Sequence, residues 1–203
     1  MKPVKPYDVR RMPYPTRLDL ASIIATAFRL LERDGPEGLT MRALARDLGV
    51  SAPSLYFHVE SRDDLLHQLI ADGLTRFGAV QREAIRGGAL RDRVRRISEA
   101  YIAFAESGPQ LFTLIFGPCT NEPQVDAGIG EAASAPVLEL AAEAVGEQRA
   151  PYFAEAIWSL VHGYTVLRLA AQFQMNPDHE AGFWYALDLL LSGAQVAGRA
   201  PAR

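Results

Sequence analysis

LTMRALARDLGVSAPSLYFHVESRDDLL, residues 39–66, is the stretch that decides the fold of this chain. In its first half, four apolar residues recur at the i, i+3, i+4 and i+7 spacing of one helical face: Met41, Leu44, Ala45 and Leu48. Thr40 stands at the N-cap, where its hydroxyl can accept a backbone N–H of the first turn. Gly49 predicts the end of this helix, because glycine readily takes the left-handed conformation that closes helices.

A second, very short helix is predicted over residues 52–58. Ser51 takes its N-cap position, and Pro53 falls in the first turn, where a missing N–H removes no intrahelical bond. Leu55 is its clear core residue, and Val59 follows. A helix this short cannot bury the three rings of Tyr56, Phe57 and His58. Some of them must therefore face outward.

Two short helices joined by a glycine turn, with a further helix capped by Ser61, have the order of a helix-turn-helix. In that motif the second helix enters the major groove of DNA with its N-terminal residues at base edges, while hydroxyls and helix ends hold phosphates. Arg62 lies in the first turn of the further helix, where it is placed to meet the DNA backbone. The pattern therefore predicts a DNA-binding protein.

The same segments resemble the TetR family of transcriptional regulators over roughly residues 18–74. The resemblance rests on T-M-R-A-L-A, L-G-V-S, L-Y-F-H-V and S-R-D-D-L-L, and the run 52–59 is similar to the tetracycline-repressor branch. It implies that Thr40 and Tyr56 contact phosphates, that residues 51–54 and 57–58 line the groove, and that Arg62 touches the DNA backbone. The residues expected at the DNA are Thr40, Arg42, Ser51, Ala52, Pro53, Ser54, Tyr56, Phe57, His58 and Arg62.

One position departs from the family pattern. Many members carry a lysine just after the serine that caps the recognition helix, and this chain has Ala52 there. One phosphate or base contact is therefore expected to be missing.

Composition agrees with a globular protein that binds DNA through one part of the chain. The 203 residues are 49% hydrophobic, enough for a substantial core. Residues 1–62 carry a net charge of +3 and the remainder −6, so only the N-terminal third is basic. A lone cysteine, Cys119, excludes an internal disulfide and predicts no metal cluster, and no cofactor is indicated. The sequence shows no membrane span or signal peptide, so a cytoplasmic protein is expected.

The first 17 residues hold basic side chains among four prolines, which excludes a regular helix there. We expect a flexible basic arm. It either reaches a minor groove or is a solvated tail, and the frequency of disordered termini favours the tail.

The remaining periodicity predicts an all-α fold with two parts: a three-helix DNA-binding domain over residues 18–64 and a helical effector-binding and dimerisation domain over 65–203. A first helix is expected from Leu18 to about residues 34–36. Later helices are expected from residue 62 to the glycines at 87–88, and over 90–107, 111–116, 132–145, 151–174 and 179–197. Pro136 is expected to kink or split its helix.

The last two expected helices carry apolar residues on more than one side. One face packs on the domain, and a second copy of the chain is the economical partner for the other, in a four-helix bundle across a two-fold axis. The resemblance implies the same homodimer. It would read a palindromic operator in double-stranded DNA, with half-sites one turn or a multiple of it apart. Charge placed at Leu187 or Leu190 is expected to break this dimer.

The resemblance also implies a small-molecule cavity in the C-terminal domain. The candidate lining is Tyr101, Phe104, Phe112, Phe116, Trp158 and His162, which favours a small hydrophobic or aromatic effector. Each is more often plain core. Trp158, His162 and Gly163 also resemble the signature of the Trp-His-Gly class of C-terminal domains, in which Gly163 would permit close helix approach.

Two features of the C-terminal part have competing interpretations. His162 is either a structural ring hydrogen-bonded to a carbonyl or hydroxyl, the more frequent case, or a ligand contact. The arginines at 91, 93, 95 and 96 suggest an anion site, but on a helix they spread over several faces, which favours a solvated surface.

Three function classes follow. The leading one is a dimeric repressor released from DNA by a small hydrophobic ligand. The second is a helical DNA-binding dimer without an effector. The third, remote from the pattern, is an enzyme using Cys119 or His162. Cys119 has no neighbouring base in the sequence and no helix start before it, so we expect no enzyme.

Overall fold

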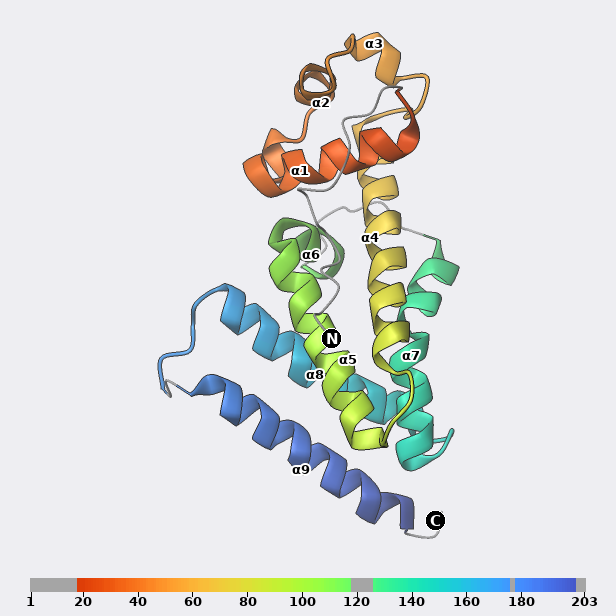
Figure 1. The fold of residues 1–203 in the computed structure, drawn as a ribbon, viewed down its shortest axis with the longest axis vertical. Coiled ribbons are helices and arrows are strands. Elements are labelled where there is room, and N and C mark those ends of the chain that lie inside the picture. Colours follow the sequence, from red (N-terminus) through yellow and green to blue (C-terminus); the bar gives the residue numbers. More distant parts are fainter. Residues whose placement is uncertain (1–17, 118–125, 176–177, 200–203) are drawn as a thin grey trace. The chain divides into compact units, whose positions relative to one another are not determined.

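The computed structural model describes residues 18–117, 126–175 and 178–199, with side chains to residue 194 (Figure 1). Within these ranges the regular elements are α-helices and no strand occurs, which confirms the all-α prediction. The helices are α1 (Leu20–Gly38), α2 (Met41–Leu48), α3 (Ala52–Leu55), α4 (Arg62–Ala84), α5 (Leu90–Ser107), α6 (Pro109–Phe116), α7 (Ala127–Val145), α8 (Ala150–Leu169) and α9 (His179–Arg199). The expected arm over residues 1–17 and Cys119 lie outside the described residues.

The helices form two compact units. The first holds α1 to α3, α4 up to Arg76, and the segment from Ser107 to Gly130 that contains α6. The second holds the rest of α4, α5, most of α7, and α8 and α9. The first unit is larger than the predicted domain over 18–64, because α4 continues past residue 64 and α6 packs on α1. The functional boundary at residue 64 stays a prediction.

The first unit is built around the apolar face of α1. Asp19 caps this helix by accepting the Ser22 N–H at 2.8 Å, and the Ser22 hydroxyl accepts the Asp19 N–H in return. The regular part of this helix ends near residues 34–36, as expected. Gly35 takes φ 72° and ψ 179°, which kinks the chain, and Pro36 then begins one more turn that ends at Gly38. The buried core of this unit includes Ile23, Ala27, Phe28, Leu31, Leu44, Leu55, Leu65 and Leu69.

The second unit buries one face each of α5, α7, α8 and α9. Its core includes Val94, Ile97, Tyr101, Phe104, Leu140, Ile157, Val161, Phe183 and Leu187. Helix α8 stops at Leu169, short of the expected end at residue 174. The Gln172 N–H bonds the Leu167 carbonyl at 2.9 Å and Ala171 takes φ 53°, so the helix closes in a left-handed turn. Helix α7 continues through the buried Pro136.

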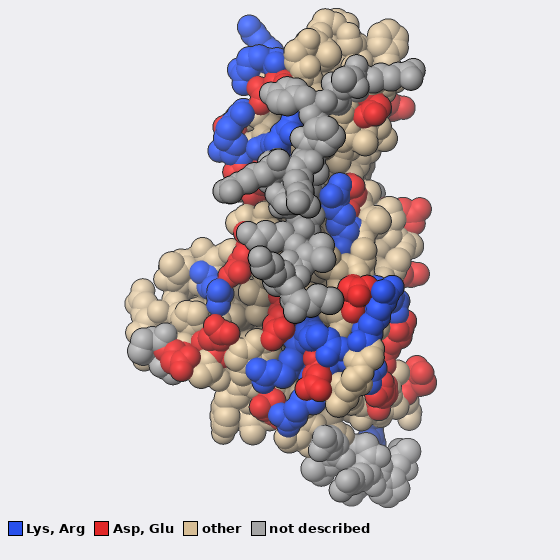
Figure 2. Space-filling view, in the orientation of Figure 1, with Lys and Arg blue, Asp and Glu red and all other residues tan. Residues whose placement is uncertain are grey.

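The arginines of α5 brace this unit, so the expectation of a plain solvated face was wrong. Their long side chains reach carboxylates, a ring and carbonyls of neighbouring segments, which periodicity within one helix does not show. Arg91 pairs with Asp188 and Arg93 with Glu143, Arg95 lies over the Trp184 ring, and Arg96 donates to the carbonyls of Ala84, Arg86 and Gly87. Figure 2 shows basic and acidic side chains intermingled over this region. Among the described helices, none is long and apolar enough to span a membrane.

Candidate nucleic-acid interface

Helix α2 begins and ends as its sequence predicts. The Thr40 side chain accepts the Ala43 N–H at 3.1 Å, so threonine caps the first turn. Gly49 takes φ 70°, and its N–H bonds the Arg46 carbonyl at 3.1 Å. The Val50 N–H then bonds the Ala45 carbonyl at 3.0 Å, which completes the turn toward α3.

Helix α3 is shorter than expected. It spans residues 52–55, and the three residues that follow form turns, because the Tyr56 N–H bonds Pro53 at 3.2 Å and the His58 N–H bonds Leu55 at 2.9 Å. The prediction of a helix to His58 was therefore wrong at its C-terminal end.

Ser51 occupies the N-cap of α3, as predicted, but its side chain does not cap the helix. The Ser51 hydroxyl instead lies 2.7 Å from the Ser54 hydroxyl, while the Ser54 N–H bonds the Ser51 carbonyl at 3.0 Å. The two hydroxyls therefore form an exposed polar pair at the start of the helix.

The surface of α3 divides sharply between buried and exposed side chains. Leu55 and Val59 are fully buried and anchor the segment. Tyr56 is 53% exposed, Phe57 is 88% exposed, and His58 is also exposed. A phenylalanine this open to water lacks burial in the chain itself, so it is available to a partner. All three rings face outward, whereas the length of the helix predicted only that some of them would.

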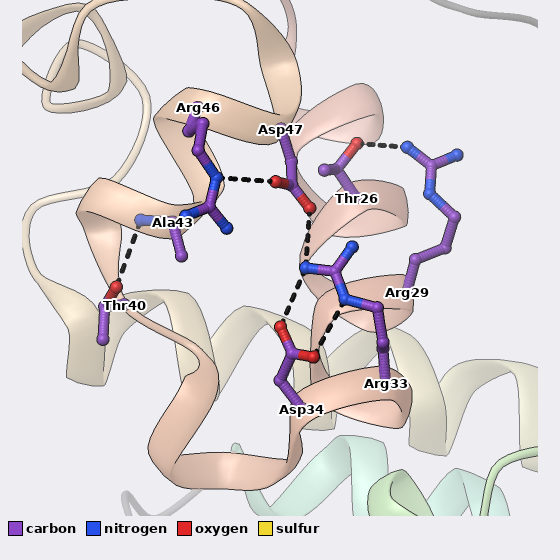
Figure 3. A network of polar contacts seen from close by, with 8 residues as sticks. All are labelled: Thr26, Arg29, Arg33, Asp34, Thr40, Ala43, Arg46 and Asp47. Atoms are coloured by element: carbon purple, nitrogen blue, oxygen red, sulfur yellow. Dashed lines mark hydrogen bonds and ion pairs between the residues drawn. The ribbon is translucent and has the colours of Figure 1, made fainter.

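An ionic network attaches α2 to α1 (Figure 3). The Arg33 guanidinium of α1 lies 2.8 Å from an Asp34 oxygen and 3.0 Å from an oxygen of Asp47 in α2. Arg46 reaches the other Asp47 oxygen at 3.3 Å. The Arg33 guanidinium lowers the pKa of the Asp34 carboxyl. These groups are largely exposed, so the network orients α2 more than it stabilises the fold.

Arg62, expected at the DNA backbone, is engaged inside the chain. Its Nε donates to the Leu39 carbonyl at 2.8 Å and its Nη2 to the Pro36 carbonyl at 2.7 Å. These carbonyls belong to the α1–α2 connection, which therefore rests on the start of α4. Ser61 caps α4 as predicted, accepting the Asp64 N–H at 3.0 Å.

The exposed surface around α2 and α3 combines hydroxyls, rings and a few cations. Of the residues expected at the DNA, most are exposed, while Ala52, Ser54 and Arg62 are half-buried. In Figure 2, basic side chains lie over the region of α1 and α2, and the outer end at α3 is mostly uncharged. The expected residues thus lie on α2, on α3 and the turns that follow it, and, for Arg62, at the start of α4.

The residues expected around an effector fall into three groups. Tyr101 and Trp158 line a small cavity of about 30 Å³ in the second unit, and the Tyr101 hydroxyl lies 2.9 Å from His162 Nδ1. Phe104 packs edge-on against Phe77, with ring centroids 5.1 Å apart, and does not line that cavity. The remaining pair lies on α6 in the first unit and forms a ring contact at 5.2 Å: Phe112 and Phe116.

Burial shifts the pKa of both Tyr101 and His162 in the direction that favours the neutral form. Burial raises the pKa of Tyr101, although a hydrogen bond with Trp158 opposes the shift. Burial also lowers the pKa of His162. The Trp158 and His162 rings lie 5.5 Å apart, as their i, i+4 spacing predicts. The sequence missed Gln81 and Ser98, two buried polar residues that also line the cavity.

Gly163 does not support a close helix approach among the described residues. A Cβ built there would meet no atom within 4 Å. The expectation that this glycine admits a neighbouring helix was therefore wrong for the chain by itself.

A wide apolar groove of about 650 Å³ runs along α8 and α9. Its lining is Val145, Phe153, Leu160, Ala186, Leu189, Leu190, Gly193 and Ala194. Leu189 is 56% exposed, whereas Leu187 is fully buried in the chain's own core. The expectation that charge at Leu187 would test a dimer was therefore wrong, because that change would disrupt folding.

Models of known protein families match two parts of this chain. Residues 23–69 match the bacterial regulatory proteins of the tetR family, and residues 94–190 match the tetracyclin repressor-like C-terminal domain. The first match contains α2, α3 and the start of α4.

Individual relatives agree with these matches. An uncharacterized HTH-type transcriptional regulator of Mycobacterium tuberculosis is 30% identical over 167 residues, covering 79% of this chain and 75% of the relative. The class D tetracycline repressor protein of Escherichia coli is 43% identical over 60 residues, which cover 30% of this chain and 28% of the repressor. A solved structure of a protein of unknown function from Rhodococcus sp. RHA1 is similar with a TM-score of 0.75 and 27% identity, covering 90% of this chain and 98% of the other.

Proposed function

This chain belongs to the TetR family and is a DNA-binding transcriptional regulator, and on that premise we propose that it grips a palindromic operator through α2 and α3 as a homodimer. One observation carries the proposal. Helix α3 and the turns after it are anchored by buried Leu55 and Val59, yet they leave Phe57 88% exposed beside exposed hydroxyls. This is the surface that a helix-turn-helix inserts into the major groove.

Two hydroxyls serve phosphates in this proposal. Tyr56 is 53% exposed, which leaves its ring edge open to the DNA backbone. Thr40 caps α2, and its place at a helix start favours a phosphate oxygen nearby. Arg42, exposed in the first turn of α2, adds attraction for phosphate.

In this proposal the residues at the start of α3 and the exposed ring of Phe57 contact the bases. The Ser51 and Ser54 hydroxyls lie together at the helix start and can donate to or accept from base edges. The Phe57 ring can make an apolar contact with the methyl group of a thymine. Ala52 and Pro53 let the backbone approach closely, and His58 stands next to the ring. Arg62 is left with an indirect part, supporting the α1–α2 connection.

A second copy of the chain is the partner proposed for the groove of α8 and α9. The groove is almost wholly apolar, and Leu189 stands exposed on it. Pairing the same face across a two-fold axis buries it and places two recognition helices for a palindrome. The match of residues 94–190 to the repressor-like C-terminal domain supports this arrangement.

The effector proposed for the second unit is a small neutral molecule with a hydrophobic or aromatic body. The cavity at Tyr101 and Trp158 holds about 30 Å³, so binding requires it to widen. Neutral Tyr101 and His162 offer a hydrogen bond to one polar group, while the remaining walls are mainly apolar. Such a ligand releases DNA when it binds the DNA-incompetent conformation better.

The two alternatives predict different results. A DNA-binding dimer without an effector would show no thermal shift with any neutral aromatic compound. An enzyme using His162 would turn over a substrate and lose that activity with His162→Gln, whereas the Tyr101–His162 contact is sufficient for a structural or ligand-binding role. We do not propose catalysis.

The test compares four substitutions on operator fragments selected by the wild-type protein, at one stated salt concentration. Thr40→Ala and Tyr56→Phe are expected to weaken binding to all DNA sequences by about tenfold, since a hydrogen bond to a charged group is lost. Ser54→Ala and Phe57→Ala are expected to change sequence preference. Tyr152→Phe, an exposed tyrosine of α8, is the matched control. Unchanged affinity and preference in all four would remove the interface.

A further inference from the structure

A carboxylate of α1 caps a helix that lies far along the chain. Glu32 Oε2 accepts the Gln110 N–H at 3.1 Å, and Oε1 accepts the Leu111 N–H at 2.8 Å. These are first-turn N–H groups of α6, which have no partner within their own helix. The N-cap of α6 is Gly108, which provides no side-chain cap. Glu32 therefore supplies from α1 the cap that α6 lacks, with a negative charge at the positive end of the helix.

Close packing at two glycines reinforces this attachment. A Cβ added to Gly108 would lie 3.1 Å from the Phe28 ring and 3.3 Å from Glu32 Oε1. A Cβ added to Gly73 of α4 would lie 2.8 Å from Ile115 of α6. Helix α6 is thus seated against both α1 and α4, and a side chain added at either glycine would push its neighbours aside.

The next residue of α1, Arg33, forms an ion pair with a different helix, α2. Arg33 binds Asp47 of α2 at 3.0 Å (Figure 3). Its neighbour in the sequence, Glu32, binds α6. One turn of α1 therefore holds α6 and α2 together within the first unit. Along the chain, α6 follows α5 with Gly108 alone between them.

We propose that Glu32 is a positioning residue that couples α6 to α2 through α1, so that the placement of α6 sets the DNA affinity of the helix-turn-helix. The affinity part rests on the proposed function. The coupling between α6 and α2 does not, because it concerns contacts within the free protein.

The test uses the full chain with Glu32→Gln, and Glu37→Gln as a control on an exposed glutamate of the same helix. Glutamine keeps one acceptor oxygen but places an NH₂ group against the other N–H, so it cannot cap both. Amide hydrogen exchange is measured at residues 110–111 and across α2, and operator affinity is measured by fluorescence anisotropy. In Glu32→Gln we expect exchange at residues 110–111 to rise by about tenfold, since a charge-assisted bond is lost. Exchange in α2 is expected to rise with it, and affinity to fall severalfold, while Glu37→Gln matches the wild type.

Two results would overturn the proposal. Unchanged exchange at residues 110–111 would mean that the cap does not hold α6. Faster exchange there, with α2 exchange at the wild-type value, would mean that α1 does not couple the helices. If Glu32→Gln does not fold, Gly108→Ala takes its place, because the added methyl presses on Phe28 and Glu32 and is expected to loosen the same amides. If the wild type binds no operator, the proposed function fails, and the exchange data still decide the coupling.

Discussion

Replacing Arg62 by methionine separates a role inside the chain from a role at the DNA. Methionine keeps an apolar stem of similar length and removes the guanidinium. In the structure that group donates to the carbonyls of Leu39 and Pro36, at 2.8 and 2.7 Å. The substitution leaves both carbonyls without this donor and loosens the connection between α1 and α2.

The size of the effect follows from the exposure of the two bonds. A hydrogen bond from a charged donor contributes about 1.5–3 kcal/mol. The bond to Leu39 is part-buried and the bond to Pro36 is at the surface, where water replaces much of it. Counting roughly one full bond gives about 2 kcal/mol. For a chain of this size each kcal/mol shifts Tm by about 2–4 °C, so Tm is expected to fall by about 4–8 °C.

The assay is thermal unfolding of the free protein at one fixed concentration, since the proposed dimer would make Tm depend on concentration. Arg86→Met is the control, because Arg86 lies just after α4, is 71% exposed, and pairs with Glu83 three residues earlier. That pair is expected to contribute no more than about 0.5 kcal/mol. Two results together would refute the internal role: a Tm for Arg62→Met equal to that of the control, and a salt dependence of DNA binding reduced by about one phosphate. They would show instead that Arg62 contacts a DNA phosphate.

Three further predictions concern other parts of the chain. Leu55→Ala removes the fully buried anchor of α3 and is expected to cost about 2–5 kcal/mol in chemical denaturation; a cost below about 1 kcal/mol would show that α3 is not anchored there. Leu189→Arg is expected to give folded monomers in sedimentation, because the exposed side chain lines the apolar groove, and a surviving dimer would place the interface elsewhere. Burial lowers the pKa of His162 below its usual 6.5, so as pH falls the unfolded chain takes up the proton first and stability present above that value is lost. The free energy of unfolding of His162→Gln is expected to fall less steeply than that of the wild type between about pH 7.5 and about pH 5.5. Equal slopes of stability against pH for the two proteins would contradict this.

The parts of the interface that depend on local chemistry were predictable. Thr40 as a cap and Gly49 as a left-handed stop act within one turn of their helix, so their types and spacing were sufficient. The length of α3 was not predictable. A helix this short has little helix preference of its own, so the burial of Leu55 and Val59 decides where it ends.

Contacts between distant segments were beyond the sequence patterns. Arg62 binds a carbonyl 23 residues away, and Glu32 binds an N–H 79 residues away. Periodicity describes one helix at a time, so it could not show the carbonyls that Arg62 reaches, and it assigned Glu32 no role. The same limit applies to α9, where leucines at 187, 189, 190 and 191 occupy several sides. Only packing shows that Leu187 is core and Leu189 is exposed.

The selection of genomic fragments tests the central claim, DNA recognition by α2 and α3 in a dimer, most directly. The purified protein is incubated with fragmented DNA of its source organism at moderate, stated salt, and the bound fragments are sequenced. We expect one shared palindrome whose half-sites lie one helical turn or a multiple of it apart, and its loss with Phe57→Ala. Recovery of random fragments, or the same palindrome with Phe57→Ala at full affinity, would contradict it.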